Sequence, residues 1–486
     1  MRPPEARHGS ARREEAPVRA LRRRSRTALA LLALLLSGCG MLAPSYERPA
    51  APVATRFPSD TAATPGATPA ADIAWQTHFQ DPQLRTLIAL ALEHNRDLQV
   101  AVLNIEQARA QLQLRRADEL PTVQAGAAAS RQPTTAGGIS SSYTAGLSIT
   151  GYELDLFGRV RNLGDAALAQ LLATEEARKT VQIGLVAAVA NTWLSLLADD
   201  ALLRLTADTL RSREESLRLV RLKVAQGVSP EVELRQAESL REAARIAQAQ
   251  WTRQQALDRN ALTLLTGQPA LPAGAGIAGP LPAPATLALP MPDALPSELL
   301  VRRPDVRQAE QQLRAAHANI GAARAAFFPR ITLTTSIGTA SAELGRLFHG
   351  GTYGWSFAPQ ITLPLFDAGR NQAGLDAAEV GRSIAVAQYE RVIQTAFREV
   401  ADVLSTRETL EQQQAAQVAQ AAAEGERLRL TELRQRHGAA SALEVLDAQR
   451  SSYAARQAVL QLQLQLLQSQ VNLYKVLGGG WKDPAP

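Results

Sequence analysis

The sequence predicts an α+β chain made of two copies of one half-domain, each with a pair of strands and a pair of very long helices. Motifs recur in the same order in both halves: Pro121 and Pro329 each follow a helical stretch, and Leu154–Phe157 returns as Leu363–Phe366. Alternating strand patterns come after both prolines, and long proline-free stretches follow the strands. A repeat of this length is a whole half-domain rather than one unit of a solenoid.

The N-terminus is expected to be a lipoprotein signal peptide covering residues 1–38. An arginine-rich stretch precedes an apolar run, residues 27–36, which is too short to span a bilayer as a mature helix. The run ends in Leu-Ser-Gly before Cys39, which looks like a bacterial lipobox, so Cys39 would carry the lipid. An ordinary signal peptide is the alternative, but Cys39 is the only cysteine, which also excludes an intrachain disulfide. Gly40, where an aspartate would favour retention in the inner membrane, indicates sorting to the outer membrane.

The net charge of +6 does not indicate a nucleic-acid partner. Most of the excess arginines lie before Cys39 and would leave with the signal peptide. Aromatic residues make up only 4% of the chain and are not interleaved with basic residues, as single-strand binders require. No nucleic-acid partner is therefore expected.

The mature chain is expected to contain five segments. They are a lipidated N-terminal tether (39–72), a first repeat (73–268), a Pro/Gly-rich connector (269–297), a second repeat (298–480) and a C-terminal tail (481–486). A composition rich in proline and alanine predicts that the tether is extended. A similar composition marks the connector as a surface segment.

Four segments alternate between apolar and small or polar residues, which is typical of half-buried strands. They are residues 143–150, 331–337, 353–363 and, more weakly, 123–127. Such segments could form a soluble sandwich face, but segments of about ten residues with polar partners also characterise transmembrane barrels. Because lipid does not tolerate an open sheet edge, four spanning strands would require several copies of the chain. Two copies would give eight strands and three would give twelve, and the strands alone do not decide between them.

Long proline-free stretches predict the helices. Residues 162–226 and 371–437 would each form one helix of about 65 residues, roughly 97 Å long. Shorter helices are expected at 81–117, 231–267, 303–326 and 441–477. The long helices carry too many charges to lie in lipid. No segment after Cys39 offers about 18 uninterrupted apolar residues, so no transmembrane helix is expected in the mature chain.

Each long helix is expected to turn back at a tip that contains glycine and serine. Gly227 is placed to end the first long helix, Ser229 to cap the next one and Pro230 to occupy its first turn. Gly438 and Ser441 have the corresponding positions at the second tip. These five residues are the predicted tip turns.

Two carboxylates follow the second tip on one face of a helix. Glu444 completes a capping box with Ser441, and Asp447 lies three residues further on. One interpretation is a helix cap beside a solvated surface. The other is a pore constriction, because rings of carboxylates in a symmetric oligomer set cation selectivity and gating. The residues alone do not favour the second interpretation.

Motifs for catalysis, metal binding or cofactor binding are not evident. The six histidines form no pair with metal-ligand spacing, and there is no G-x-S-x-G motif. Residues 274–279 match G-x-G-x-x-G, but they follow no strand and run directly into Pro280, so a dinucleotide fold is not expected. The chain is therefore not expected to be an enzyme or to hold a metal or cofactor other than the lipid on Cys39.

Together these segments resemble the TolC-like outer-membrane efflux proteins, and among them the lipoprotein branch called NodT-like. The resemblance covers essentially the whole mature chain. Its carriers include YERP at 46–49, NRDL at 95–98, RRPDV at 302–306, FFP at 327–329, LFDAG at 365–369, VLDAQR at 445–450 and LGGGW at 477–481. Each motif is weak alone, but their order on this repeat is specific.

The resemblance implies a homotrimer with a twelve-stranded barrel in the outer membrane and a long α-barrel crossing the periplasm. The tips would dock on a periplasmic adaptor joined to an inner-membrane pump, often of the resistance-nodulation-division (RND) class. The chain would then be a passive exit duct for small toxic compounds. Glu444 and Asp447 match acidic positions that line the closed periplasmic entrance in relatives. Gln435 and Ala440 replace a tyrosine and an arginine that latch the tip in one relative, so that latch is not expected here.

Two other functions are compatible with parts of this pattern. A duct for type I protein secretion would have the same body and a different pump, and the lipobox favours efflux over it. A lipid-anchored coiled-coil spacer without a pore is the structural alternative. The four alternating strands argue against the spacer.

Overall fold

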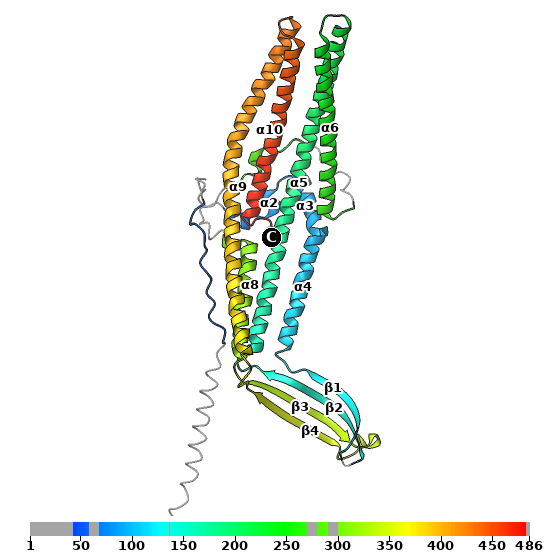
Figure 1. The fold of residues 1–486 in the computed structure, drawn as a ribbon, viewed down its shortest axis with the longest axis vertical. Coiled ribbons are helices and arrows are strands. Elements are labelled where there is room, and N and C mark those ends of the chain that lie inside the picture. The colour runs from blue at the N-terminus through cyan, green and yellow to red at the C-terminus, as the bar shows by residue number, and fades with distance from the viewer. Residues whose placement is uncertain (1–41, 58–67, 136, 270–278, 290–299, 483–486) are drawn as a thin grey trace, which may run out of the picture. The chain divides into compact units, whose positions relative to one another are not determined.

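The computed structural model describes residues 42–57, 68–135, 137–269, 279–289 and 300–482 (Figure 1). The chain divides into two compact units. Unit 1 contains the strands with the adjoining helix ends (up to 47, 112–167 and 314–382), and unit 2 contains the remaining helical parts (48–111, 168–313 and from 383 onward).

Unit 1 contains one antiparallel four-stranded sheet. Its strands are β1 (Val123–Pro133), β2 (Ile139–Leu154), β3 (Arg330–Ser341) and β4 (Tyr353–Thr362), and a short 3₁₀ turn, η3 (Leu344–Arg346), lies between the last two. The strands pair in the order β1-β2-β3-β4, so β1 and β4 are edges (Figure 1). All four predicted strands are confirmed, and β1, the weakest pattern, is 11 residues long.

The element order repeats along the chain. The first series is α4 (Arg96–Ala117), β1, β2, α5 (Arg159–Ala225) and α6 (Glu231–Thr266); the second is α8 (Pro304–Ala325), β3, β4, α9 (Arg370–Arg436) and α10 (Ala442–Val476). Both α5 and α9 are unbroken over 67 residues, which confirms the two predicted long helices. The return helices are confirmed at 36 and 35 residues.

The expected single helix at 81–117 is wrong, because the chain breaks at Asn95 into α3 (Pro82–His94) and α4. Asn95 has an extended backbone conformation. Its Nδ2 donates to the Leu265 carbonyl (3.0 Å), and its Oδ1 accepts from the Leu98 backbone N–H (3.0 Å). One side chain therefore caps α4 and fastens the break to the end of α6.

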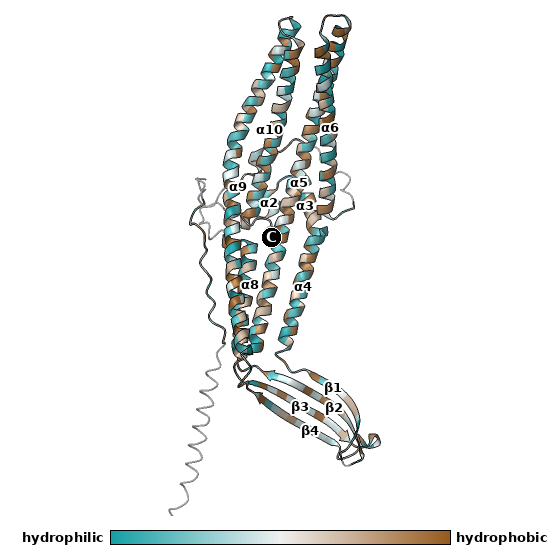
Figure 2. Cartoon of the chain, in the orientation of Figure 1, coloured by the Kyte–Doolittle hydropathy of each residue, from teal (hydrophilic) through white to brown (hydrophobic). Residues whose placement is uncertain are grey.

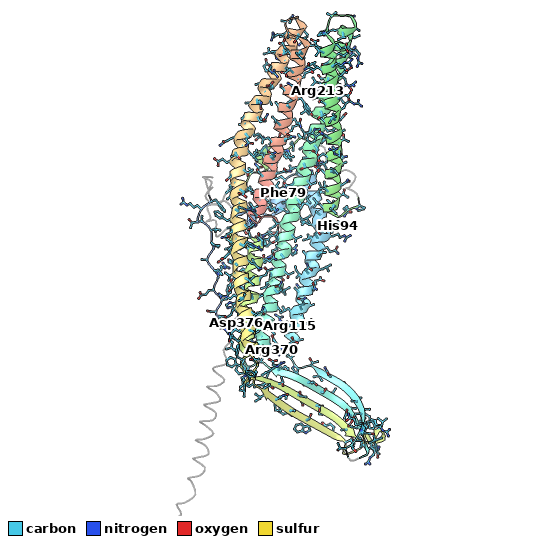
Figure 3. The ribbon with its side chains drawn as sticks, viewed as in Figure 1. Phe79, His94, Arg115, Arg213, Arg370 and Asp376 are labelled. Carbon is cyan, nitrogen blue, oxygen red and sulfur yellow. The ribbon has the colours of Figure 1, made fainter. Side chains whose placement is uncertain are left out.

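An aromatic cluster joins the start of unit 2 to its end. Two short elements, η1 (Ala70–Asp72) and α2 (Trp75–His78), lie at the start of the unit, and a third, η2 (Pro284–Leu287), lies in the connector. Phe79, labelled in Figure 3, is fully buried, and the His78 ring stacks on Tyr474 at 4.1 Å. Burial lowers the pKa of His78 to about 4, so the ring is neutral at ordinary pH. The Tyr474 hydroxyl donates to the Ile73 carbonyl (2.7 Å).

The arginine-rich motif at 302–306 also serves the fold of unit 2. Arg303 is buried and donates to the carbonyl of Val476 (2.9 Å) at the end of α10. Its guanidinium pairs with Asp305 (2.6 Å) and with Glu399 of α9 (2.8 Å). A buried arginine of this kind is neutralised by carboxylates and joins three helices.

Of the helices in the described part of the chain, α5 alone is long and apolar enough to cross a membrane by length and composition. Of its most apolar stretch, 67% is buried within the protein, which is the pattern of a core helix. Figure 2 shows apolar residues interleaved with hydrophilic ones along its length.

The expected tether is described at residues 42–57 and 68–72, and the first of these stretches has no helix or strand and is held by specific contacts. In unit 2, Arg48 makes a bidentate contact with the buried Glu310 of α8 (2.8 and 3.0 Å). In unit 1, His317 Nε2 lies 2.7 Å from the Pro44 carbonyl, and its ring meets Tyr46 edge-on. This part of the segment is therefore docked rather than free.

Candidate functional site

The sheet has one polar and one apolar face, as period-two alternation predicts. Pairing aligns residues across all four strands: one row is Gln124, Ser148, Ser336 and Ser356, and the next row, on the opposite face, is Ala125, Leu147, Ile337 and Trp355. The hydroxyls of Ser336 and Ser356 are 2.7 Å apart and hydrogen-bonded. The two faces suit different surroundings.

No described residue of unit 1 covers the apolar face of the edge strand β4. Its large side chains are mostly exposed: Tyr353 (66%), Trp355 (74%), Phe357 (59%) and Ile361 (69%). A contiguous exposed patch of this kind marks a surface for another protein or for lipid. The sheet is therefore incomplete in a single chain in water.

A row of glycines crosses the sheet and was not predicted from the sequence. Gly126, Gly146, Gly338 and Gly354 are aligned by pairing and lie on the polar face. A Cβ on Gly146 would collide with the backbone of Ile337, and a Cβ on Gly338 would collide with that of Ala145. The central strands thus approach closely at these glycines, and residues around the row line a hollow of 520 Å³. Glycines at such positions permit a sheet to bend.

The two strand-to-helix junctions differ. In the first, Phe157 stacks on Phe328 (4.8 Å), and the nearly buried Glu153 pairs with Arg159 (2.8 Å) and Arg330 (2.7 Å). In the second, the corresponding Leu365 and Phe366 are 90% and 91% exposed. The first junction is packed within the chain, whereas the described part of unit 1 leaves the apolar side chains of the second junction exposed.

The two predicted glycine turns are confirmed. Gly227 and Gly438 have φ of 73° and 75°, the left-handed conformation that glycine adopts without strain. In both turns the N–H of the following residue bonds to the carbonyl five residues earlier, from Val228 to Lys223 (2.9 Å) and from Ala439 to Arg434 (2.8 Å). Together with a bond from each glycine N–H, these are Schellman motifs.

The helix caps after the turns differ from each other. Ser441 caps α10 and forms the predicted capping box with Glu444. At the first tip Pro230 occupies the N-cap position and Ser229 donates to the Glu233 carboxylate instead. The expectation that Ser229 caps α6 and Pro230 lies in its first turn is therefore wrong, because α6 begins one residue later than that arrangement requires.

Both candidate constriction residues lie on α10 and are paired with arginines of α9. Hydrogen bonds from Ser441, with a smaller effect of Arg434 at 3.6 Å, hold the pKa of Glu444 below its usual value. Asp447 contacts Arg427 of α9 (3.3 Å) and Arg450 of its own helix. The two side chains are 49% and 42% exposed, so they remain available to solvent or to another chain.

Within the described ranges, no group of three or more His, Cys, Asp and Glu side chains is arranged to hold a metal ion. Cys39, the predicted lipid site, lies outside the described residues, as does most of the glycine motif at 274–279.

The family described as outer membrane efflux protein matches this chain at residues 87–268 and 295–479. TtgC of Pseudomonas putida, named a probable efflux pump outer membrane protein, is 46% identical over 470 residues, covering 94% of this chain and 96% of TtgC. Outer membrane protein OprJ of Pseudomonas aeruginosa is 46% identical over 467 residues, covering 93% and 95% of the two chains.

Solved structures agree with the sequence relatives. The MtrE outer membrane channel of Neisseria gonorrhoeae, in its open state, matches with a TM-score of 0.84 and 41% identity over 91% of this chain and 99% of MtrE. A membrane protein from Pseudomonas aeruginosa matches with a TM-score of 0.85 and 44% identity over 90% of this chain and all of the other. The predicted resemblance is confirmed: this chain belongs to the outer membrane efflux protein family, a family of outer-membrane transport proteins.

Proposed function

We propose that this chain is the exit duct of a tripartite efflux system and works as a homotrimer. Each copy would supply four strands to a twelve-stranded barrel in the outer membrane and its long helices to an α-barrel in the periplasm. The tips would dock on a periplasmic adaptor joined to an inner-membrane pump of the RND class. The duct itself performs no chemistry.

The observation that carries the proposal is the incomplete sheet. Its edges β1 and β4 are open, its apolar face is exposed and its central strands crowd together on the polar face. A sheet that bends toward its polar face has the curvature of a membrane barrel with a polar interior. Lipid does not tolerate open edges, so β4 of one copy must pair with β1 of the next.

The internal repeat indicates which residues meet at that junction. Leu154 of β2 pairs with Ile331 of β3, and their counterparts at the open edges are Leu363 and Val123. Phe157 packs on Phe328 within the chain, so its exposed counterpart Phe366 would pack on another copy. The contact between copies then repeats the contact between the two halves of one chain.

Cysteine cross-linking in membranes tests this assembly. In the double variant Leu363→Cys/Val123→Cys, oxidation should give covalent dimers and trimers. This is expected because the cysteine at position 363 of one copy would lie beside the cysteine at position 123 of the next copy. The matched control, Leu363→Cys/Ala129→Cys, places the second thiol farther along β1 and should stay monomeric. A stable detergent-solubilised monomer with full strand content would contradict the barrel.

Glu444 and Asp447 are proposed to ring the periplasmic entrance, so that three copies place six carboxylates around it. The double variant Glu444→Gln/Asp447→Asn should weaken the cation preference of single channels in planar bilayers. Glutamine retains a side-chain oxygen for the capping box, so Glu444→Gln alone is the structural control. If the double variant lowers thermal stability and leaves selectivity and conductance unchanged, the two residues are only cap and surface.

Cys39 is proposed to carry the lipid, and Cys39→Ser should abolish incorporation of radiolabelled palmitate.

The relatives bear names such as toluene efflux pump and solvent efflux pump outer membrane protein, which supports small toxic organic compounds as cargo. Expression in a host that lacks its own outer-membrane duct should restore tolerance to such compounds. Restored secretion of a protein without restored tolerance would favour the type I secretion duct instead.

A further inference from the structure

Arg213 of α5 is a buried cation in the half of unit 2 nearer to the tip turns, labelled in Figure 3. It is only 4% exposed, and its Nη1 donates to the Leu240 carbonyl of α6 (2.7 Å). The guanidinium carbon lies 5.3 Å from the centre of the Tyr453 ring of α10. In this way Arg213 touches both helical hairpins, α5–α6 and α9–α10.

The charge of Arg213 is not balanced by a protein anion. Among the described residues, no carboxylate forms an ion pair with the guanidinium, and its buried Nε has no hydrogen-bond partner. Arginine does not lose its proton in proteins, and buried charges are ordinarily paired. Arg303, which has two carboxylate partners, shows the usual arrangement in this same chain.

A polar cavity of 160 Å³ lies against Arg213. Its lining includes Ser212 of α5 together with Ser452 and Arg456 of α10. The carboxylate that lines it is Asp208, which is 70% exposed and paired with Arg211 (3.2 Å). Two arginines therefore face one carboxylate that is engaged elsewhere, and hydroxyl groups are available as further donors.

We propose that this cavity binds a small inorganic anion, either a halide or phosphate, which supplies the counter-charge to Arg213. The anion would accept from the Arg213 guanidinium and be held between α5 and α10. Because these helices belong to different hairpins, bound anion would stabilise their contact. The site depends on residues of one chain and not on the proposed trimer.

Thermal unfolding of the full-length detergent-solubilised protein tests the proposal. At constant ionic strength, replacing the bulkier anion gluconate with chloride or phosphate should raise the midpoint by about 2–4 °C at saturation. Chloride and phosphate are titrated separately to distinguish the two ligands. The rise should be lost in Arg213→Gln and kept in Arg218→Gln, an exposed arginine of the same helix that pairs with Glu215.

Equal rises in both variants would mean a general salt effect and would overturn the proposal. No rise in the wild type would mean that Asp208 or a carboxylate of another copy neutralises Arg213, and would also overturn it. If Arg213→Gln does not fold, wild-type crystals grown with bromide test the anion site directly. An anomalous peak beside Arg213 Nε supports the site, and its absence at saturating bromide refutes it.

Discussion

Helices α5 and α9 have the same length and corresponding places in the two repeats, yet their surroundings differ. Trp193 and Leu197 near the middle of α5 are 3% and 2% exposed, whereas Asp402 and Thr406 near the middle of α9 are exposed. Helix α5 is buried by its own chain, and much of α9 is not. The two repeats therefore share helix length and element order. Their long helices differ in role, because α5 belongs to the core of its own chain whereas α9 presents a surface that partners can contact.

Leu197→Ala should have the largest effect. It removes a buried side chain from α5 and should lower the free energy of unfolding by about 2–5 kcal/mol. Thr406→Ala at an exposed position of α9 should change it by no more than about 0.5 kcal/mol. Urea unfolding in detergent measures both. Comparable losses would mean that α9 is as deeply buried as α5 in the assembled protein.

Asp199 of α5 should make the stability of the protein depend on pH. Burial, followed by the nearby charge of Asp258, raises the pKa of Asp199 to about 7. The folded state thus holds a proton that the unfolded state releases near pH 4, so this contribution is present in acid and is lost as pH rises through 7. Between pH 5 and 8 the wild type should lose about 1–3 kcal/mol that Asp199→Asn retains. Glu408→Gln, at an exposed position of α9, is the control variant.

The glycine row gives a similar comparison between the β1–β2 hairpin and the β3–β4 hairpin. Gly146→Ala places a methyl group against the backbone of β3 and should destabilise the sheet by about 1–3 kcal/mol. Gly354, in the second strand of the other hairpin, has open space around its Cβ position, so Gly354→Ala should be milder. Yield of heat-resistant oligomer on gels is the measurement. An equal loss of heat-resistant oligomer in the two variants would show that another copy of the chain packs closely against β4.

The two tips should show the smallest difference. Ser441→Ala removes a side-chain cap and should cost α10 about 1 kcal/mol, while Ser229→Ala removes no backbone cap from α6 and should cost less. Amide hydrogen exchange in the first turn of each helix reports the effect locally. A larger increase in the exchange rate at α6 in Ser229→Ala than at α10 in Ser441→Ala would contradict this ranking of the two caps.

The elements governed by local chemistry could be predicted from the sequence. Proline-free stretches predict α5 and α9, and Gly227 and Gly438 mark their turns because few other residues adopt that backbone conformation. The break at Asn95 could not be predicted, because it depends on a bond to Leu265, far away along the chain. The local sequence there contains neither glycine nor proline.

Parts of the candidate site depended on tertiary packing in the same way. Glycines are visible in each strand, but their alignment into one row requires the pairing register. Arg213 resembles any other arginine of a charged helix, and its burial follows only when α6 and α10 pack around it. Glu444 and Asp447 could be placed on one helix face, whereas their arginine partners on α9 required the folded hairpin.

The glycine row has a consequence for permeation. If the polar face of the sheet lines the proposed duct, then at that level the wall consists of peptide groups with no side chains projecting inward. Substitution at any of the four positions can only narrow the passage there. The size limit for a permeating molecule must then be set at another level, and mutations that enlarge it should be found away from this row.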